Sequence, residues 1–173
     1  MSKEQSKHEV IELVIEQIPI GTLSNEKHDA LCEFIRFNFE TTESYQVFGM
    51  HHYVMRRKLP DVDVTPLQFR QSLLGLVSFD TSLYKLYNVC VTPALRGRGY
   101  GKRMMKEVLS VIQKQLPHIH CVYLDVNEDN ANAHKVYSDV GFTEIAYVDA
   151  PKPIHYIMEY IFNDTPQEIN KHE

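Results

Sequence analysis

Hydrophobic positions in the first forty residues follow two different periods. Aliphatic and β-branched residues dominate from Glu9 to Ile18, and Pro19 and Gly21 close this run, which predicts a first strand. Ser24 then occupies a position suited to a helix N-cap. Four residues follow it at helical spacing: Leu31, Phe34, Ile35 and Asn38. The pattern therefore predicts a strand and then a helix that runs to about Glu40.

The next stretch, from Thr41 to Gln71, has the least regular pattern. Its spacing favours a short amphipathic helix with five residues on one face: Val47, Phe48, His51, Val54 and Met55. The segment from Pro60 to Pro66 ends the secondary-structure element that precedes it. Two apolar runs follow, Ser72–Phe79 and Tyr84–Val91, and the short polar link between them predicts an antiparallel hairpin.

Beyond Val91 the apolar pattern changes from strand to helix. After Pro93 and a glycine-rich turn, six apolar residues share one helix face: Met104, Met105, Val108, Leu109, Ile112 and Leu116. Pro117 stops this helix, and Ile119–Val126 is predicted to be a buried strand. A strand, a crossover helix and a second strand of this kind form a right-handed parallel unit.

The last third of the chain predicts one more helix and two more strands. Asn130 caps a helix that Gly141 ends. Phe142–Val148 and Ile154–Ile161 alternate as strands, and the tail from Asn163 to Glu173 is polar. The chain contains neither an internal repeat nor a low-complexity tract.

Composition narrows the class of protein. At 173 residues, with 43% hydrophobic and 24% charged residues, the chain fits one soluble domain over residues 1–173 with an ordered core from about 8 to 162. Apolar runs fall short of the roughly 20 residues that cross a bilayer, and the N-terminus does not resemble a signal sequence, so we expect a cytoplasmic protein without a membrane partner. The cysteines, Cys32, Cys90 and Cys121, lack metal spacing, so we predict reduced thiols and no metal. A net charge of −5 argues against a nucleic-acid partner and for a cationic one.

The turn between the two parallel strands carries three glycines, Gly97, Gly99 and Gly101. Glycines let the backbone adopt positive φ and let amide N–H groups approach a ligand at the positive end of the next helix. Four cationic residues surround the turn: Arg96, Arg98, Lys102 and Arg103. Because this local charge opposes the acidic balance of the whole chain, the stretch predicts a phosphate site.

Two better-known phosphate loops do not fit the spacing. A nucleoside-triphosphate loop needs four residues between its glycines and then Lys and Ser or Thr, whereas Gly97 and Gly101 enclose three and Arg103 follows Lys102. A dinucleotide fingerprint needs glycine where Lys102 stands, and its first glycine directly after the strand that ends at Val91.

The remaining pattern resembles the acetyl-coenzyme A signature of the GNAT superfamily of N-acetyltransferases, which is Arg or Gln, Gly, x, Gly, x, Gly or Ala. Residues 96–101 (RGRGYG) fit every position, and Val91-Thr92-Pro93 before them is also typical. A second block resembles a later part of the same superfamily: Asp125, Asn130, Ala131, Ala133, Tyr137, Gly141 and Phe142. The whole arrangement is most similar to the branch that acetylates protein N-termini, including the alanine of ribosomal proteins.

This resemblance implies an α/β (α+β) fold of the GNAT type. Its sheet is mixed and mostly antiparallel, with six to seven strands, and about four helices flank it. The two central parallel strands splay apart near Val91 and Val126, and the coenzyme arm enters the gap between them.

The resemblance also implies acetyl-CoA as the cofactor. The residues expected to bind it are Val89, Cys90, Val91, Arg96, Gly97, Arg98, Gly99, Tyr100, Gly101, Lys102, Asn130, Ala133 and Lys135. The first three offer backbone groups to the pantetheine arm, as another strand would, and one amide polarises the thioester carbonyl. Cys90 is then a bystander and not a nucleophile.

Two side chains are implied to be catalytic in a direct transfer of acetyl from the thioester to an amine. Tyr137 donates a proton to the departing sulfur, and Asp125, where the branch usually has Glu, acts as the base through water. Spacing alone leaves the alternatives open: Tyr137 as a core tyrosine on a helix face, and Asp125 as a carboxylate that caps a turn.

The acceptor expected first is a protein N-terminus, followed by a polyamine or another small primary amine, in a monomer or homodimer. Five residues of the irregular stretch are candidates for substrate contact, against a packed helix as the alternative: Tyr45, Phe48, His51, His52 and Tyr53. Two rivals stay open: an acyl-CoA-binding regulatory module without turnover, and a nucleotide-binding domain.

Overall fold

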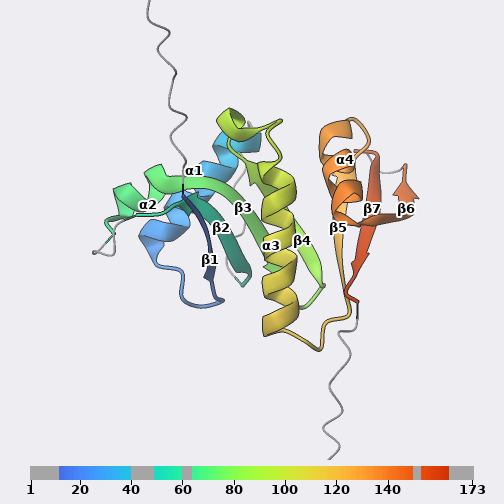
Figure 1. Cartoon of the computed structure of the whole chain (residues 1–173), viewed down its shortest axis with the longest axis horizontal. Helices are drawn as coiled ribbons and strands as arrows, with labels where there is room; N and C mark the ends of the chain where they lie inside the picture. The colour runs from blue at the N-terminus through green and yellow to red at the C-terminus, as the bar shows by residue number, and fades with distance from the viewer. Residues whose placement is uncertain (1–11, 40–48, 60–63, 150–152, 164–173) are drawn as a thin grey trace, which may run out of the picture.

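Seven strands and four α-helices make up the computed structural model, which describes residues 12–39, 49–59, 64–149 and 153–163 (Figure 1). In chain order they are β1 (Leu13–Ile18), α1 (Asn25–Phe39), β2 (His51–Arg57), α2 (Pro66–Ser72), β3 (Leu73–Asp80), β4 (Lys85–Val91), α3 (Tyr100–Gln115), β5 (Cys121–Asn127), α4 (Ala131–Val140), β6 (Thr143–Val148) and β7 (His155–Ile161), with a 3-10 turn, η1 (Pro93–Leu95), between β4 and α3.

The strands form one sheet in the order β1-β2-β3-β4-β5-β7-β6. Adjacent strands are antiparallel except β4 and β5, which are parallel and central. The hairpin of β3 and β4 and the parallel crossover through α3 are thereby confirmed, as is the mixed, mostly antiparallel GNAT-type sheet.

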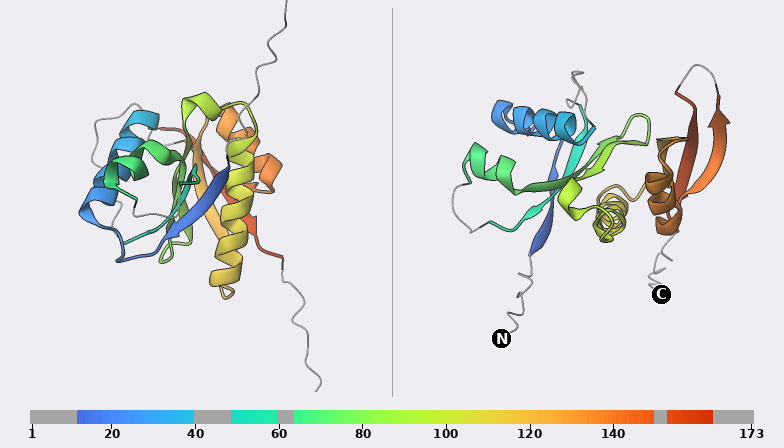
Figure 2. Two further views of the ribbon diagram at one scale, coloured as in Figure 1. Left: turned by 60° about the vertical axis from the view of Figure 1, so that its left-hand side comes forward. Right: turned by 90° about the horizontal axis from the view of Figure 1, so that it is seen from above.

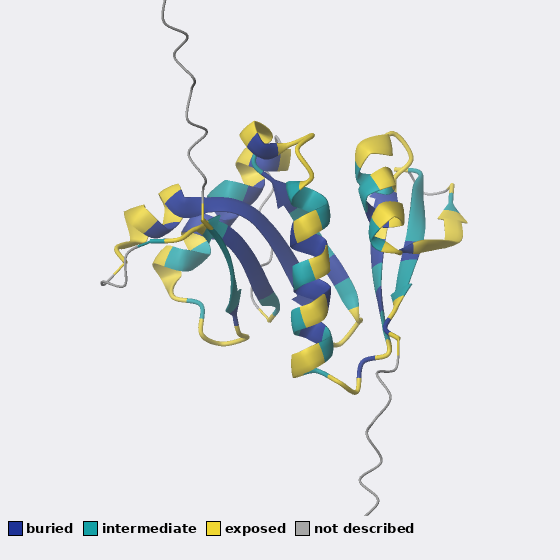
Figure 3. Cartoon of the chain, in the orientation of Figure 1, coloured by how far each residue is buried: buried dark blue, intermediate teal, exposed yellow. Residues whose placement is uncertain are grey.

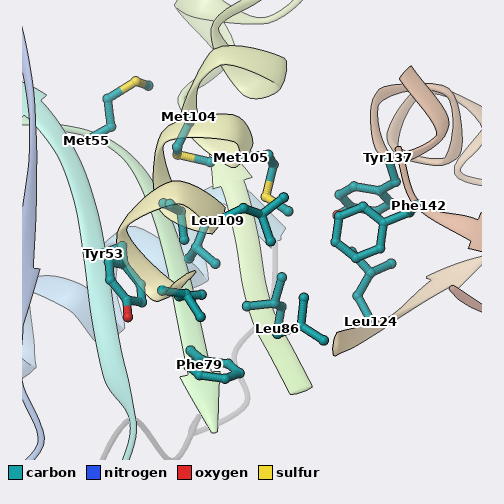
Figure 4. Close-up of a cluster of buried hydrophobic side chains, with 14 of the residues drawn as sticks. Tyr53, Met55, Phe79, Leu86, Met104, Met105, Leu109, Leu124, Tyr137 and Phe142 are labelled. Atoms are coloured by element: carbon teal, nitrogen blue, oxygen red, sulfur yellow. The ribbon is translucent and has the colours of Figure 1, made fainter. Parts of the chain in front are cut away.

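Helices cover both faces of the sheet. Helices α1 and α2 lie on one face of β1–β4, while α3 and α4 lie on the opposite face (Figures 1 and 2). The predicted apolar stripe of α3 is confirmed, because its five buried residues join the larger core cluster with Leu124 of β5 and Tyr137 of α4 (Figure 4). A smaller cluster joins Leu31 and Ile35 of α1 to Leu76 of β3. Ser24 caps α1 as predicted, since its Oγ accepts a hydrogen bond from the Lys27 N–H at 3.3 Å.

The predicted amphipathic helix that includes His51, Val54 and Met55 is wrong, because these residues form β2. Four consecutive residues, from His52 to Met55, are buried, which no single helix face allows. They are apolar on both sides because α1 and α2 cover one face of β2 and α3 the other. Val47 and Phe48 lie outside the described residues.

Helix α2 was not predicted, because the segment from Pro60 to Pro66 favours the end of an element and not the start of one. Pro66 is the first residue of α2, a position where proline loses no helical hydrogen bond. Thr65 and Gln68 form a reciprocal capping box in front of it: the Gln68 N–H donates to Thr65 Oγ at 3.3 Å and the Thr65 N–H donates to Gln68 Oε1 at 2.9 Å.

The central pair of strands separates soon after it begins. Within residues 64–149, which the structure describes without a gap, β4 and β5 pair only at Lys85 and Tyr123, and the Tyr123 N–H donates to the Tyr84 carbonyl at 2.8 Å. Beyond this pair the two strands diverge (Figure 1). We call the interval between β4 after Lys85 and β5 after Tyr123 the seam.

Candidate active site

The loop from Arg96 to Gly101 leads directly into α3. Gly97 and Gly99 have φ of 70° and 79°, which disfavours any residue with a side chain. A Cβ at either position would meet nothing within 4 Å, so conformation and ligand access, not packing, require glycine there. Gly99 is the N-cap of α3 and supplies no side-chain hydrogen bond, and the first turn contains no acidic residue. The first amides of α3 are therefore available to an anion.

The N-terminus of α3 lies close to both strand β4 and helix α4. A Cβ on Gly101 would lie 3.8 Å from Val91 Cγ2 and 3.9 Å from Val136 Cγ1. The loop that was predicted to hold phosphate thus opens at the end of the seam, beside the turn of α4 that carries Tyr137.

The cationic side chains around the loop have different partners. Lys102 and Lys135 both reach Asp139, at 3.7 Å and 3.3 Å, so one carboxylate links α3 to α4. Arg103 pairs with Glu107 one turn along α3 at 2.7 Å. The exposed side chain of Arg98 has no hydrogen bond or ion pair with the described residues, so it is the loop cation most available to a ligand.

Arg96 uses its side chain in a different way from Arg98. Its Nε donates to the Val91 carbonyl at 2.9 Å, and one terminal nitrogen donates to the carbonyl and the Oδ1 of Asn38 at 3.2 and 3.3 Å. Asn38 belongs to the last turn of α1, whose carbonyls lack helical partners. The guanidinium therefore ties the loop to the end of α1, and this tie competes with any contact between the Arg96 side chain and phosphate.

Strand β4 contains a bulge where it borders the seam. Ser78 of β3 pairs with Tyr87, whereas Leu76 pairs with Cys90, so β4 has one extra residue. Asn88 occupies the bulge with a φ of 52°. Past the bulge the Thr92 N–H donates to β3, and alternation then directs the backbone groups of Val89 toward the seam. Val91 faces the same way, but its carbonyl already accepts the hydrogen bond from Arg96.

Tyr137 is buried on the α3 side of the sheet. Its ring packs against Phe142 with centroids 5.9 Å apart, and Leu124 of β5 lies nearby (Figure 4). Burial raises the pKa of the Tyr137 phenol above its ordinary value, and negative charge on Cys90 would raise it further. Burial likewise raises the pKa of the Cys90 thiol to about 12, so this thiol stays protonated and unreactive.

Asp125 lies on the opposite face of β5. Leu124 and Val126 point into the larger core cluster, so alternation turns Asp125 toward the face that α1 and α2 cover farther along the sheet. Its Oδ2 lies 2.6 Å from Lys85 Nζ on β4. The two predicted catalytic side chains are thus not neighbours: they border the seam from its two sides.

Three of the predicted cofactor-binding residues, Asn130, Ala133 and Lys135, lie in α4 or at its N-cap. Asn130 caps the helix, with its Oδ1 accepting the Ala133 N–H at 3.2 Å. Ala133 packs partly buried against the core, and Lys135 is exposed. Gly141 ends the helix with a φ of 120°. The Asn130 side-chain oxygen is therefore engaged by its own helix.

The candidates of the irregular stretch divide into three groups. Tyr45 and Phe48 lie outside the described residues. His52 and Tyr53 are buried, at 1% and 0% exposure, so the surface gives a substrate no access to them. His51 is half-buried, and its Nδ1 lies 3.3 Å from Gln17 Nε2. Of these five, His51 alone keeps surface access within the described part of the chain.

Sequence reasoning missed four polar residues around the seam: Asn38, Lys85, Asn88 and Asp139. Only Asn88 left a signal, because a polar residue between Tyr87 and Val89 breaks the apolar alternation of β4. The other three gain their roles through partners up to 58 residues away.

None of the described helices is long and apolar enough to span a bilayer.

Comparison with known proteins agrees with this geometry. The model of the acetyltransferase (GNAT) family matches residues 67–142. Over 60 residues the chain is 33% identical to the [ribosomal protein bS18]-alanine N-acetyltransferase of Haemophilus ducreyi, covering 35% of this chain and 40% of that protein. Over 62 residues it is 36% identical to the N-alpha-acetyltransferase RimI of Mycobacterium tuberculosis, covering 36% of each. These alignments span less than half the length of the curated relatives.

Solved structures resemble the whole fold. Arabidopsis thaliana NAA60, in complex with a bisubstrate analogue, superposes with a TM-score of 0.65 at 19% identity, over 87% of this chain and 99% of that one. Spermidine N-acetyltransferase of Vibrio cholerae, with CoA and spermine, gives a TM-score of 0.57 at 15% identity, over 86% and 95%. At such identities the likeness concerns the fold alone. In its signature loop, its splayed parallel strands and the matched segment, the chain is similar to the acetyltransferase (GNAT) family.

Proposed function

We propose that this chain is an acetyl-CoA-dependent N-acetyltransferase that moves acetyl directly to a primary amine, with a protein N-terminus as its preferred acceptor. The observation that carries the proposal is the seam. Uncapped amides of α3, the open edge of β4 and a buried phenol border the same interval. We infer a cytoplasmic enzyme, which agrees with its three free cysteines.

The residues present fit a coenzyme A thioester. The amides after Gly99 and the free guanidinium of Arg98 suit a diphosphate, and Lys102 and Lys135 add charge at the mouth of the same loop. Backbone groups of Val89 suit the amides of a pantetheine arm, which pair as a neighbouring strand would. The thioester itself supplies an activated acyl group.

Tyr137 is proposed as the acid. Because burial raises its pKa, the phenol is neutral at physiological pH and carries the proton that a departing thiolate needs. Its place on the α3 side of the sheet, opposite to Asp125, leaves the other side of the seam for the amine.

Asp125 is proposed to receive the amine proton through water, and the pKa of the amine decides how much of the acceptor already lacks that proton. Its Oδ2 lies 2.6 Å from Lys85 Nζ, and this ion pair holds the carboxylate at the border of the seam. An α-amino group, with a pKa near 8, is about one-tenth neutral at pH 7, whereas an alkylamine near 10.4 is almost entirely charged. An N-terminus therefore needs less deprotonation than a polyamine, which favours it as the acceptor.

The similar proteins are named for two acceptor classes, a protein N-terminus and spermidine, and a test of the proposal compares these acceptors. The wild-type chain would be supplied with acetyl-CoA and either a peptide with a free alanine N-terminus, the same peptide with a blocked N-terminus and one lysine, or spermidine. Free thiol would measure turnover, and mass spectrometry would locate the acetyl group. We expect transfer to the free N-terminus and at least tenfold less to the other two acceptors.

Tyr137→Phe tests the catalytic assignment in the same assay. Removing a general acid should lower kcat by about a hundredfold or more, with acetyl-CoA affinity nearly unchanged. The matched control is Tyr160→Phe, which removes a phenol whose ring also packs against Phe142, with centroids 5.4 Å apart. Tight CoA binding without thiol release from any acceptor would instead support the regulatory module, and preferred transfer to spermidine would support the polyamine enzyme.

A further inference from the structure

Three polar side chains cross the covered half of the sheet, one from each of three adjacent strands. Nδ1 of His52 in β2 lies 3.0 Å from Oγ of Ser78 in β3, and Nδ2 of Asn88 in β4 donates to the same Oγ at 3.1 Å. His52 and Ser78 are 1% and 0% exposed. Their Cα atoms are direct partners in the ladder of β2 and β3.

This buried network ends on the bulge of β4. Asn88 holds a φ of 52°, a left-handed conformation that asparagine tolerates better than most residues but does not prefer. Its side-chain amide is anchored by Ser78 Oγ, the residue of β3 that stands beside the bulge. The hydroxyl oxygen accepts this hydrogen bond and lies 3.0 Å from Nδ1 of His52, so it joins the two side chains.

The bulge decides which backbone groups face the seam. Before it, the Tyr84 carbonyl faces β5 and accepts the Tyr123 N–H. In a regular strand the same alternation would direct Cys90 to the seam and Val89 to β3. The extra residue reverses the direction of the backbone groups that follow it: Cys90 pairs with Leu76 of β3, and the Val89 N–H faces the seam.

We propose that His52 and Ser78 are positioning residues that act through Asn88: they hold the bulge of β4 and thereby aim the Val89 amide at the thioester carbonyl. The inference rests on the proposed function, because it assigns a task to the seam of an acetyltransferase. It explains why polar groups lie between two apolar layers where valine or threonine would suit a strand. An amide fixed before the reaction stabilises the charge that develops on the carbonyl oxygen.

Ser78→Ala is the first test, with Ser72→Ala as its matched control. Ser72 is also buried, and its hydroxyl donates to the Phe69 carbonyl at 2.7 Å within α2, away from the seam. Both changes delete one buried hydroxyl. We expect Ser78→Ala to lower kcat by about 10- to 100-fold, as misplacing an oxyanion donor does. The Kd for CoA should change less than about threefold, and Ser72→Ala should leave kcat unchanged.

A spectroscopic readout separates positioning from a general loss of structure. Acetyl-CoA labelled with ¹³C at the carbonyl should show a downfield shift of that carbon when bound to the wild-type chain without acceptor, because an amide donates to its oxygen. In Ser78→Ala the shift should return toward the value of free acetyl-CoA. In Ser72→Ala it should stay as in the wild type.

Asn88 supplies a second pair of variants in case Ser78→Ala folds poorly. Glycine adopts a φ of 52° without strain, whereas alanine does not, so Asn88→Gly should retain several times the kcat of Asn88→Ala. Any of three results would overturn the inference: equal kcat in these two variants, an unchanged carbonyl shift in Ser78→Ala, or equal kcat in Ser78→Ala and Ser72→Ala. The wild-type chain would still be active in each case. A wild-type chain that transfers acetyl to no amine would overturn the proposed function itself.

Discussion

The two halves of the sheet differ in how much of their surface is covered. Strands β1–β4 lie between α1 and α2 on one face and α3 on the other, and seven of the eight residues of β3 are buried. Strands β5–β7 have α4 on one face, and among the described residues no helix packs on the other (Figure 2). Strand β6 is exposed along five of its six residues (Figure 3).

This difference places the chemistry at the border between the halves. The covered half holds the bulge, where half-buried Asn88 is hydrogen-bonded to the buried Ser78 beside the buried His52. The open half leaves Asp125 accessible on an uncovered face, where an acceptor can approach it. The proposed reaction would therefore use the rigid edge of β4 for the thioester and the open face beside Asp125 for the amine.

The largest expected contrast concerns stability. Leu76→Ala in β3 empties a fully buried site, which should lower the free energy of unfolding by about 2–5 kcal/mol. Ile161→Ala in β7 removes side-chain atoms from a residue that is 61% exposed, and should change it by less than about 0.5 kcal/mol. Urea denaturation of both variants measures the difference. Similar losses would mean that another surface covers the open half in solution.

A smaller contrast separates the two arginines of the loop. Arg98→Ala should weaken CoA binding about tenfold, because its exposed guanidinium has no partner among the described residues, and the loss should shrink at high salt. Arg96→Ala should instead cost about 1 kcal/mol of stability, because the carbonyls of Val91 and Asn38 lose their donor. Calorimetric titration with CoA and thermal unfolding measure the two effects.

Exchanged phenotypes would contradict this assignment. If Arg96→Ala weakened CoA binding as much as Arg98→Ala at equal stability, the Arg96 side chain would have to leave Asn38 and turn to the phosphate. The tie between the loop and α1 would then be absent in the bound form.

The border between the halves is also where the sequence was most informative. From Asp80 to Phe142 each element follows from a local signal: a turn at Asp80, glycines before α3, Asn130 as a cap and Gly141 as a stop. Local signals place β5 as well, although its predicted burial holds for one face only, because no described helix covers the other face. Signals of this kind depend on near neighbours in the chain, so they survive without knowledge of the fold.

The covered half was harder to predict for the opposite reason. Strand β2 is apolar on both faces, so its period of two is hidden, and the helix-like spacing of His51, Val54 and Met55 was coincidental. The direction of the Arg96 side chain and the bulge at Asn88 depend on residues of other elements. Their geometry arises only when the sheet is assembled.

The smallest expected effect tests the link between α3 and α4 beside the seam. The hydrogen bond from Lys135, together with the charge of Lys102, lowers the pKa of Asp139 below its ordinary value. A lowered folded pKa means that the link stabilises the fold above the unfolded pKa, near 4, and is lost as pH falls through the folded value.

Asp139→Asn removes this dependence and releases both lysines. We expect CoA to bind about two- to fivefold more tightly at low salt and equally at high salt, since exposed charges are screened. Glu107→Gln, which releases only Arg103, is the control. Weaker CoA binding in Asp139→Asn would show that the carboxylate holds the lysines in place for phosphate and does not compete with it.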